Sequence, residues 1–311
     1  MLVVDFPLDF YAGFFLEHRY ELSNHTLRSW FSDFLKRAVL SFGLSLILLI
    51  ALYALIWRFP DHWWLLAWAG YAGVSYVLGK LFPVFIVPLF YRYSPVGDES
   101  LKKRICDLAG RYGMPVKNVY SLNLSRTTKK ANAAFMGIGK TKRVVLSDTL
   151  LEQFSPSEIE AVLAHELGHF KHHDIWKQLG FGLSVSLLGF WIAFHTAGVW
   201  SNAFGYSGVQ DIAGLPVLFL VFYLFSLVLM PLQNGFSRWM ERAADRFALE
   251  ACGQPGAFIS CMEKLAAVNL ADPSPHPLYE WLFYDHPAVG KRVAFAERWS
   301  KKTAERQGAV T

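Results

Sequence analysis

The sequence predicts a mainly α-helical, polytopic membrane protein with about four transmembrane helices and a larger polar region between the second and the third. Its 311 residues are 53% hydrophobic and 16% aromatic, and the mean hydropathy is +0.27, which is unusual for a soluble protein of this length. Four apolar stretches reach the roughly 20 residues that a helix needs to cross a bilayer. The polar region alternates between helical and strand periodicity, so we expect it to fold as a domain.

The four predicted spans cover residues 38–57, 63–89, 178–198 and 214–234. The second contains Lys80, Pro83 and Pro88, and we expect its far end to bend or to leave the hydrocarbon, because proline interrupts a helix. Residues 1–37 mix polar and aromatic side chains and lack the basic start and apolar core of a signal peptide. We therefore expect an interfacial segment there.

The distribution of charge indicates membrane topology rather than a nucleic-acid partner. The formal net charge is +5, yet no basic stripe with interleaved aromatic residues is present, so no nucleic acid is expected to bind. Lysine and arginine are concentrated between residues 91 and 177 and after residue 234, whereas residues 200–213 contain none. The positive-inside rule then predicts that both termini and the polar region face the cytoplasm. The three cysteines lack metal-binding spacing, so neither a disulfide framework nor a cysteine zinc site is predicted.

The polar region is predicted to combine helices with short strands. Residues 97–115 have the spacing of an amphipathic helix, and residues 118–124 and 143–148 are typical of strands. Residues 132–147 are expected to form a hairpin that turns at residues 138–142. A second helix is predicted from Ser155, with Pro156 at its first position and Glu158 completing a capping box.

The second helix carries the segment "AVLAHELGHFKHHD". His165 and His169 are four residues apart, so they share one helix face and can bind the same ion. Glu166 is next to the first histidine and lies beside such an ion rather than on it. This H-E-x-x-H pattern is typical of a zinc site in which the glutamate acts on a zinc-activated water. A catalytic zinc needs a third protein ligand.

A candidate third ligand follows the fourth span in "SRWMERAADRFALE". Glu241 can complete a His2Glu site, and Asp245, four residues later on the same face, can accept a hydrogen bond from the free ring nitrogen of a ligand histidine. Taken alone, the stretch is more typical of a charged surface helix with i,i+4 ion pairs. The upstream motif favours the metal site.

These motifs belong to a wider resemblance. In order along the chain, "EHRYELSNHT", "FPVFIVPLFYRYSPV", "NAAFMGIGKTKRVVLSDTLL", "VLAHELGHFKHHD", "SRWMERAADRFA" and "DHPAVGKRV" resemble blocks of the integral-membrane zinc metalloproteases of the type I CAAX prenyl endopeptidase family, relatives of bacterial heat-shock membrane metalloproteases. The resemblance implies a cytoplasmic, zincin-like catalytic domain made of the HExxH helix and a small sheet. It also implies one zinc ion per chain, held by His165, His169 and Glu241, with Glu166 as the catalytic base.

The resemblance adds residues that spacing alone does not select. It implies that His286 and Arg292 face the scissile carbonyl over the zinc, where a developing oxyanion needs cationic or N–H donors. Otherwise they are equally typical of a helix cap before a proline and of a surface arginine. It further implies that Asn132, Ala133 and Phe135 line a substrate-binding edge, to which an extended peptide adds as a strand.

The predicted organisation has five parts: an interfacial segment at 1–37, two transmembrane helices at 38–90, a catalytic part with the HExxH helix at 91–177, two transmembrane helices at 178–234, and a second catalytic part with the third ligand at 235–311. The predicted function is that of a zinc-dependent membrane endopeptidase, in a bacterial inner membrane or the endoplasmic reticulum. Its partners would be the bilayer and a peptide or protein substrate that could be membrane-associated or lipidated. The alternatives are a quality-control protease of the same family and a membrane scaffold with a structural zinc. Glu166 argues against the scaffold, because a structural site needs no carboxylate beside the ion.

Three departures from the family pattern are visible. Family members typically have seven spans and four are predicted here, so the chain is expected to be either a short member or one whose start lies upstream. Glu21 stands where the family has glycine, and Lys130 stands where a histidine is common. Within the zinc segment, His172 and His173 are expected to be polar residues at the membrane surface, and Asp174 a helix-end contact rather than a ligand.

Overall fold

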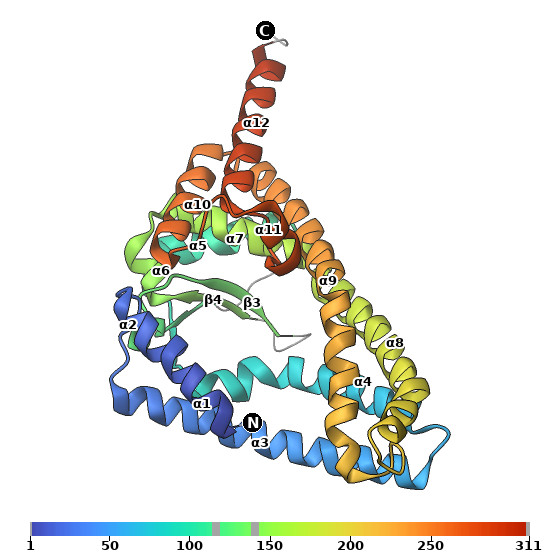
Figure 1. The fold of residues 1–311 in the computed structure, drawn as a ribbon. Coiled ribbons are helices and arrows are strands. Elements are labelled where there is room, and N and C mark those ends of the chain that lie inside the picture. Colours follow the sequence, from blue (N-terminus) through green and yellow to red (C-terminus); the bar gives the residue numbers. More distant parts are fainter. Residues whose placement is uncertain (1, 114–118, 138–142, 309–311) are drawn as a thin grey trace. The chain divides into compact units, whose positions relative to one another are not determined.

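The computed structural model describes residues 2–113, 119–137 and 143–308, and it divides into two compact units. The first unit comprises Met1–Phe31, Lys80–Ile175 and Asn234–Thr311, and the second comprises Ser32–Gly79 and Trp176–Gln233. Both are built mainly of helices (Figure 1). The predicted hairpin turn at residues 138–142 lies outside the described residues.

Within the described residues, four segments are long and apolar enough to cross a membrane, which confirms the predicted number of spans. They are α3 (Leu27–Arg58), α4 with its continuation (Trp63–Leu89), α8 (Asp174–Ala203) and the segment Ile212–Cys252. Large apolar side chains point outward from them, including Ile47 at 65% and Val228 at 76% exposure. Such surfaces are expected where lipid replaces water as the solvent.

Two of these segments differ in detail from simple straight spans. After α4 (Trp63–Leu81) the chain continues as a π-helical turn, Phe82–Ile86, and a 3-10 turn, Val87–Leu89. Pro83 and Pro88 lie in these turns, as expected for residues that cannot complete regular helical hydrogen bonding. The fourth span does not stop at residue 234: α9 runs without a break from Leu215 to Cys252. The predicted span and the predicted helix after it are therefore one helix.

The second unit has a small apolar core of its own, formed by the buried side chains of Tyr53, Ile56, Trp63, Ala193, Ala197 and Leu218. Indole N–H groups add cross-links between its segments. Trp68 donates to the carbonyl of Leu183 at 2.9 Å, and Trp57 donates to the carbonyl of Gln210 at 3.0 Å. These bonds satisfy polar atoms that lipid could not.

A four-stranded sheet in the first unit has the order β1-β2-β4-β3. The strands are β1 (Tyr93–Pro95), β2 (Val119–Leu122), β3 (Ala133–Met136) and β4 (Arg143–Ser147). β2 and β4 are parallel, whereas β3 and β4 pair antiparallel with Ala133 opposite Leu146, in line with the predicted hairpin. Among the described strands, β3 lies at an edge of the sheet.

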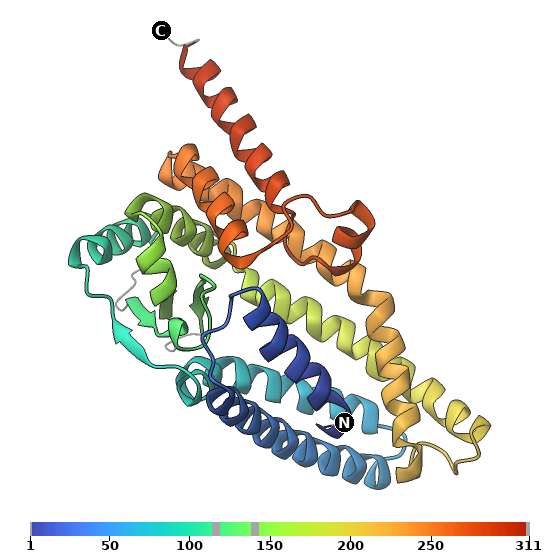
Figure 2. The ribbon, with the colours of Figure 1, turned by 60° about the vertical axis from the view of Figure 1, so that its left-hand side comes forward.

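The first unit also contains the helices α5 (Glu99–Arg111), α6 (Asp148–Gln153), α7 (Pro156–Lys171), α10 (Pro255–Asn269), α11 (Pro277–Phe283) and α12 (Val289–Gly308). α7 packs beside β3 and α5, and α10 packs on α7 and α12 (Figures 1 and 2). α7 begins with the predicted capping box between Ser155 and Glu158. The shared core includes Leu163 and Leu167 of α7 together with Phe258 of α10.

The close packing of α7 on α9 depends on one glycine. A Cβ atom at Gly168 would lie 2.9 Å from the Cα atom of Ala244 and 3.2 Å from the ring of Phe247. Distances below 3.0 Å essentially never occur for a Cβ atom. Gly168 therefore allows the two helices that carry the candidate metal site to approach each other at their backbones.

The N-terminal segment forms α1 (Leu2–Phe10), a π-helical turn (Tyr11–Leu16) and α2 (Glu17–Arg19). The chain leaves α2 through Glu21 at a φ of 57°, a left-handed conformation that explains why a glycine suits this position. Lys130 reaches back to this segment and pairs with Glu17 at 2.8 Å. Glu21 and Lys130, the two residues that depart from the family pattern, thus both lie in or contact the N-terminal segment of the first unit.

Candidate metal centre

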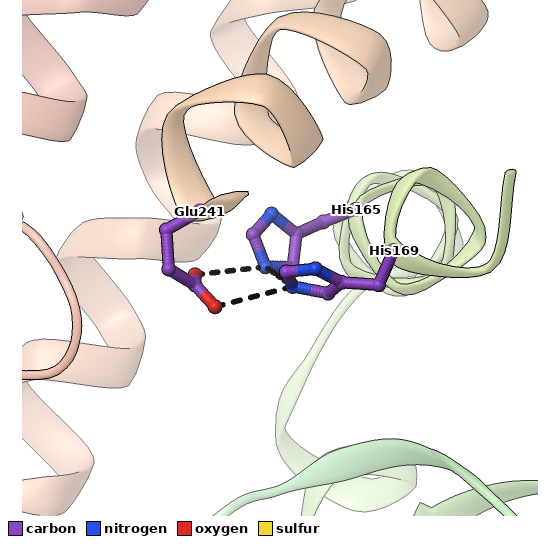
Figure 3. A group of neighbouring side chains, drawn as sticks. All are labelled: His165, His169 and Glu241. Atoms are coloured by element: carbon purple, nitrogen blue, oxygen red, sulfur yellow. Dashed lines mark hydrogen bonds and ion pairs between the residues drawn. The ribbon is translucent and has the colours of Figure 1, made fainter. Parts of the chain in front are cut away.

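Two helices bring three metal-binding side chains together. His165 and His169 project from one face of α7 toward the carboxylate of Glu241 on α9 (Figure 3). The Nε2 atoms of the histidines are 3.2 Å apart. One oxygen of Glu241 lies 3.2 Å from His165 Nε2, and the other lies 3.2 Å from His169 Nε2.

This triangle has the dimensions of a tetrahedral metal site. Zinc binds imidazole nitrogen at about 2.0–2.1 Å, which places neighbouring tetrahedral ligand atoms about 3.3 Å apart. His165 and Glu241 are both buried, at 6% exposure each. Glu241 Oε2 has no hydrogen-bond donor among the described residues. A buried carboxylate oxygen without a donor is costly unless a cation meets it, so the residues fit a metal ion.

Each histidine is oriented by an aspartate behind its ring. Nδ1 of His165 lies 2.9 Å from Asp245, and Nδ1 of His169 lies 2.9 Å from Asp174. A carboxylate can only accept from a neutral imidazole, so Nδ1 carries the hydrogen and the Nε2 lone pair points into the centre. The sequence predicted a contact of Asp245 with one of these histidines and did not predict the contact of Asp174 with His169.

The acidic groups around the histidines make the centre attractive to cations. Burial alone would lower the pKa of His165, but the nearby carboxylates of Asp245 and Glu241 favour the protonated ring and raise the pKa to about 9. Burial would likewise lower the pKa of His169, which the hydrogen bond to Glu241 raises instead. The positive charge that these carboxylates favour on the imidazoles can equally be supplied by a metal ion.

Arg292, which the resemblance implies faces the scissile carbonyl, contacts Asp245 in the structure. Its guanidinium makes a two-point ion pair with Asp245, at 2.6 and 2.9 Å, and its side chain is 11% exposed. The same group lies 3.3 Å from His165 Nδ1 and 4.0 Å from Glu241. Arg292 therefore neutralises the carboxylate that holds His165, and it lies beside the Nδ1 edge of that ring. Sequence spacing gives no sign of this pairing, because it joins α9 to α12.

His286 lies on the open side of the centre. Its Nε2 atom is 3.3 Å from Glu241 Oε1, its Nδ1 atom is 2.8 Å from Asp285, and its side chain is 52% exposed. This histidine is thus near a ligand atom and accessible to an incoming molecule. Both named residues of the "DHPAVGKRV" segment thus approach Glu241, His286 at Oε1 and Arg292 at Oε2.

Glu166 lies between the metal ligands and the edge strand. The backbone N–H of Phe135 donates to Glu166 Oε2 at 3.4 Å, so this N–H points away from β4. Asn132 has the opposite orientation, because its carbonyl accepts from Ser147 N of β4 at 2.9 Å. Backbone groups alternate along a strand, so Ala133 and Phe135 both turn their N–H and C=O groups to the outer edge. The side chain of Asn132 is exposed beside them.

The other histidines of the segment do not join the three ligands. α7 ends at Lys171, His172 is its C-cap residue, and the ring of His172 lies 6.1 Å from that of Phe247. His173 has a φ of 58°, so it lies outside the helix. This left-handed residue reverses the chain so that Asp174, the first residue of α8, reaches His169.

Comparison with known proteins agrees with this geometry. A model of peptidase family M48 matches residues 95–300. The chain belongs to peptidase family M48. Residues 1–92 of this M48 peptidase match a second model, described as the CAAX prenyl protease N-terminal region with five membrane helices.

Individual relatives cover nearly all of the M48 peptidase chain. An uncharacterized metalloprotease of Bacillus subtilis is 32% identical over 95% of this chain and 70% of its own. CAAX prenyl protease 1 of Saccharomyces cerevisiae is 29% identical over 96% and 70%. The crystal structure of S. mikatae Ste24p superposes with a TM-score of 0.86 at 28% identity, covering 94% of this chain and 72% of that one. The protein is therefore an integral membrane metallopeptidase that acts on peptide or protein substrates.

Proposed function

We propose that this M48 peptidase is a zinc endopeptidase in which His165, His169 and Glu241 hold one catalytic zinc ion. The observation that supports this most strongly is the convergence of three side chains: the two histidine Nε2 atoms are 3.2 Å apart, and each lies 3.2 Å from one oxygen of Glu241. Both rings are fixed by aspartates, and Glu166 stands free of the ligand triangle. Three protein ligands leave a fourth position for water or substrate, as catalytic zinc sites require.

The bound ion supplies Lewis acidity, which activates a water molecule and polarises the scissile carbonyl. Glu166 is then the general base that takes a proton from the water and delivers it to the leaving amine. The Nε2–H of His286 donates to the oxygen on which negative charge develops. Arg292 acts through Asp245, which keeps the His165 ring in the orientation that ligation needs.

The outer edge of β3 is the proposed substrate-binding strand. Ala133 offers its N–H and C=O groups and Phe135 its C=O group to an extended peptide, which would add to the sheet beside β3, while the Phe135 N–H contacts Glu166. Asn132 can contact the same peptide through its exposed side chain. Since Phe135 N–H lies within 3.4 Å of Glu166, a peptide bound there passes close to the general base.

The substrate class follows from the relatives rather than from a residue of this chain. Relatives from yeast, nematode and plant are named CAAX prenyl proteases, and we infer that membrane-associated peptides, including prenylated ones, are cleaved on the cytoplasmic side. Cleavage of matched peptides with and without a prenyl group tests the lipid requirement. Equal rates would favour a general membrane-protein protease.

The central experiment replaces Glu166 with glutamine. Purified Glu166→Gln protein should retain about one zinc ion per chain and lose peptide cleavage, because the amide cannot accept the proton. Wild-type activity should disappear with a chelator and return with zinc. Full cleavage by Glu166→Gln, or zinc loss without change in activity, would contradict the proposal.

A further inference from the structure

One face of α9 carries four polar side chains at the active-site end of the helix: Asn234, Arg238, Glu241 and Asp245. Spacings of four, three and four residues place them on a single stripe about 16 Å long. Glu241 and Asp245 serve the metal centre. Asn234 and Arg238 have no part in ligation, although Arg238 is buried at 9% exposure.

Both residues bind the C-terminal end of α11. Arg238 donates through Nη1 to the carbonyls of Glu280, at 3.0 Å, and of Tyr284. Its Nη2 atom lies 3.4 Å from the carbonyl of Trp281, and Asn234 donates to the carbonyl of Leu282 at 2.5 Å. The last carbonyls of a helix have no partners within it, and a cation is favourable at that end of the helix dipole.

The far side of the same segment is fixed by a carboxylate. Glu280, which is 5% exposed, accepts the backbone N–H of Ala288 at 3.1 Å and the ammonium group of Lys291. Gly290 N donates to the carbonyl of Pro273 at 2.9 Å. The segment from Tyr284 to Ala288, which carries His286, is therefore held at both of its ends.

We propose that Arg238, assisted by Asn234, is a positioning residue that sets the location of His286 relative to Glu241. The helix that provides the glutamate ligand also holds the histidine loop, so a single rigid element fixes the distance between them. The guanidinium group of Arg238 directs N–H donors at three carbonyls of one short segment, those of Glu280, Trp281 and Tyr284. A lysine could not reproduce this planar arrangement of donors. The inference rests on the proposed role of His286 in turnover.

The test is a double-mutant cycle on the purified, zinc-loaded full chain. Arg238→Ala should lower kcat by about 10- to 100-fold, since a shift of about 1 Å in a catalytic group has that effect. It should change KM little and leave the zinc content at one per chain. In a His286→Ala background, Arg238→Ala should produce no further loss, because the group that it positions is gone. Arg238→Lys should recover only part of the rate.

A matched control is available one turn along α9. Arg242 is exposed and makes no hydrogen bond or ion pair within the described part of the chain, so Arg242→Ala should keep the wild-type kcat. Asn234→Ala provides a milder form of the test if Arg238→Ala does not fold, with a smaller loss that again vanishes in the His286→Ala background.

The outcomes distinguish the positioning role of Arg238 from the proposed function of the zinc site. If His286→Ala impairs turnover and the losses from Arg238→Ala or Asn234→Ala add to it fully, the positioning role is wrong while the proposed function stands. If either positioning variant retains wild-type kcat, the positioning role is also wrong. If His286→Ala turns over at the wild-type rate, the role of His286 and this inference fail together, whereas the chelator and Glu166→Gln results still decide the zinc mechanism.

Discussion

Replacing Gly168 with alanine should weaken zinc binding without touching a zinc ligand. The new Cβ would lie 2.9 Å from Ala244 Cα, whereas ordinary contacts begin at 3.4 Å, so α7 and α9 must separate by at least the difference of about 0.5 Å. Glu241 precedes Ala244 by one helical turn and would move with it. Metal–ligand distances tolerate only about 0.2 Å.

The change in unfolding free energy caused by Gly168→Ala has two opposing contributions. Overpacking costs about 1–3 kcal/mol, whereas alanine is favoured over glycine inside a helix by about 1 kcal/mol. We therefore expect a net change in unfolding free energy of about 0 to 2 kcal/mol. The larger effect should appear in the zinc affinity, which we expect to fall by about 10- to 100-fold, as when the support of a ligand is lost.

The assay is a zinc titration against a competing chelator, together with thermal unfolding. Gly110→Ala is the matched control, because Gly110 lies in helix α5 with nothing within 4 Å of its added Cβ. It should keep the zinc affinity and raise stability by propensity alone. A Gly168→Ala protein that binds zinc as tightly as wild type and is as stable as the control would refute the close-packing argument.

Three further predictions concern residues around the site and at the start of the chain. Asp174→Asn should lower zinc affinity by about 10- to 100-fold, because the amide lacks the negative charge and can turn its NH2 group to His169 Nδ1, which would put the ring hydrogen on Nε2; chelator competition measures it. Burial alone would raise the pKa of Glu158, but hydrogen bonds from Lys264, Ser260 and Ser155 lower it from 4.5 to about 2. Its stabilisation should be complete above pH about 4.5 and be lost as pH falls through about 2, so Glu158→Gln should reduce the melting temperature near neutral pH and have progressively less effect below 4.5. Glu21→Gly should stabilise the protein by about 1 kcal/mol by removing left-handed strain, measured by thermal unfolding.

Each of these has a result that would count against it. Wild-type zinc affinity in Asp174→Asn would mean that the aspartate does not orient the ring. A melting-temperature difference between Glu158→Gln and wild type that is constant from pH 7 to pH 3 would contradict the lowered pKa. A loss of stability in Glu21→Gly would show that the glutamate makes a contact worth more than the backbone strain.

Local patterns were sufficient to predict the elements that depend on neighbours in sequence. The four spans follow from the length of each apolar stretch, and the capping box placed the start of α7 correctly. The i,i+4 rule identified His165 and His169, and the need for a third ligand pointed to Glu241, whose carboxylate oxygens lie 3.2 Å from the two histidine Nε2 atoms. These predictions depend only on residues within one or two helical turns of each other.

Contacts that depend on chain reversal or on helix packing could not be predicted. Asp174 is five residues from His169, which is not a helical spacing, and only the left-handed His173 brings it back to the ring. The pairing of Arg292 with Asp245 joins residues 47 positions apart. The continuity of α9 could not be predicted, because its apolar run ends near residue 234. The buried polar residues beyond that point are stabilised by partners that are distant in sequence.

The short edge of β3 has a consequence for how this peptidase would choose what to cut. Two residues, Ala133 and Phe135, offer only main-chain groups, and every peptide has the same main chain. If β3 binds substrate as proposed, these main-chain groups would select a chain that can lie fully extended rather than one particular sequence. Folded domains satisfy their own backbone groups and so are spared. The selection would therefore act on conformation and access: tails, linkers and unravelled segments would be cut, and the same sequence would be safe once it has folded.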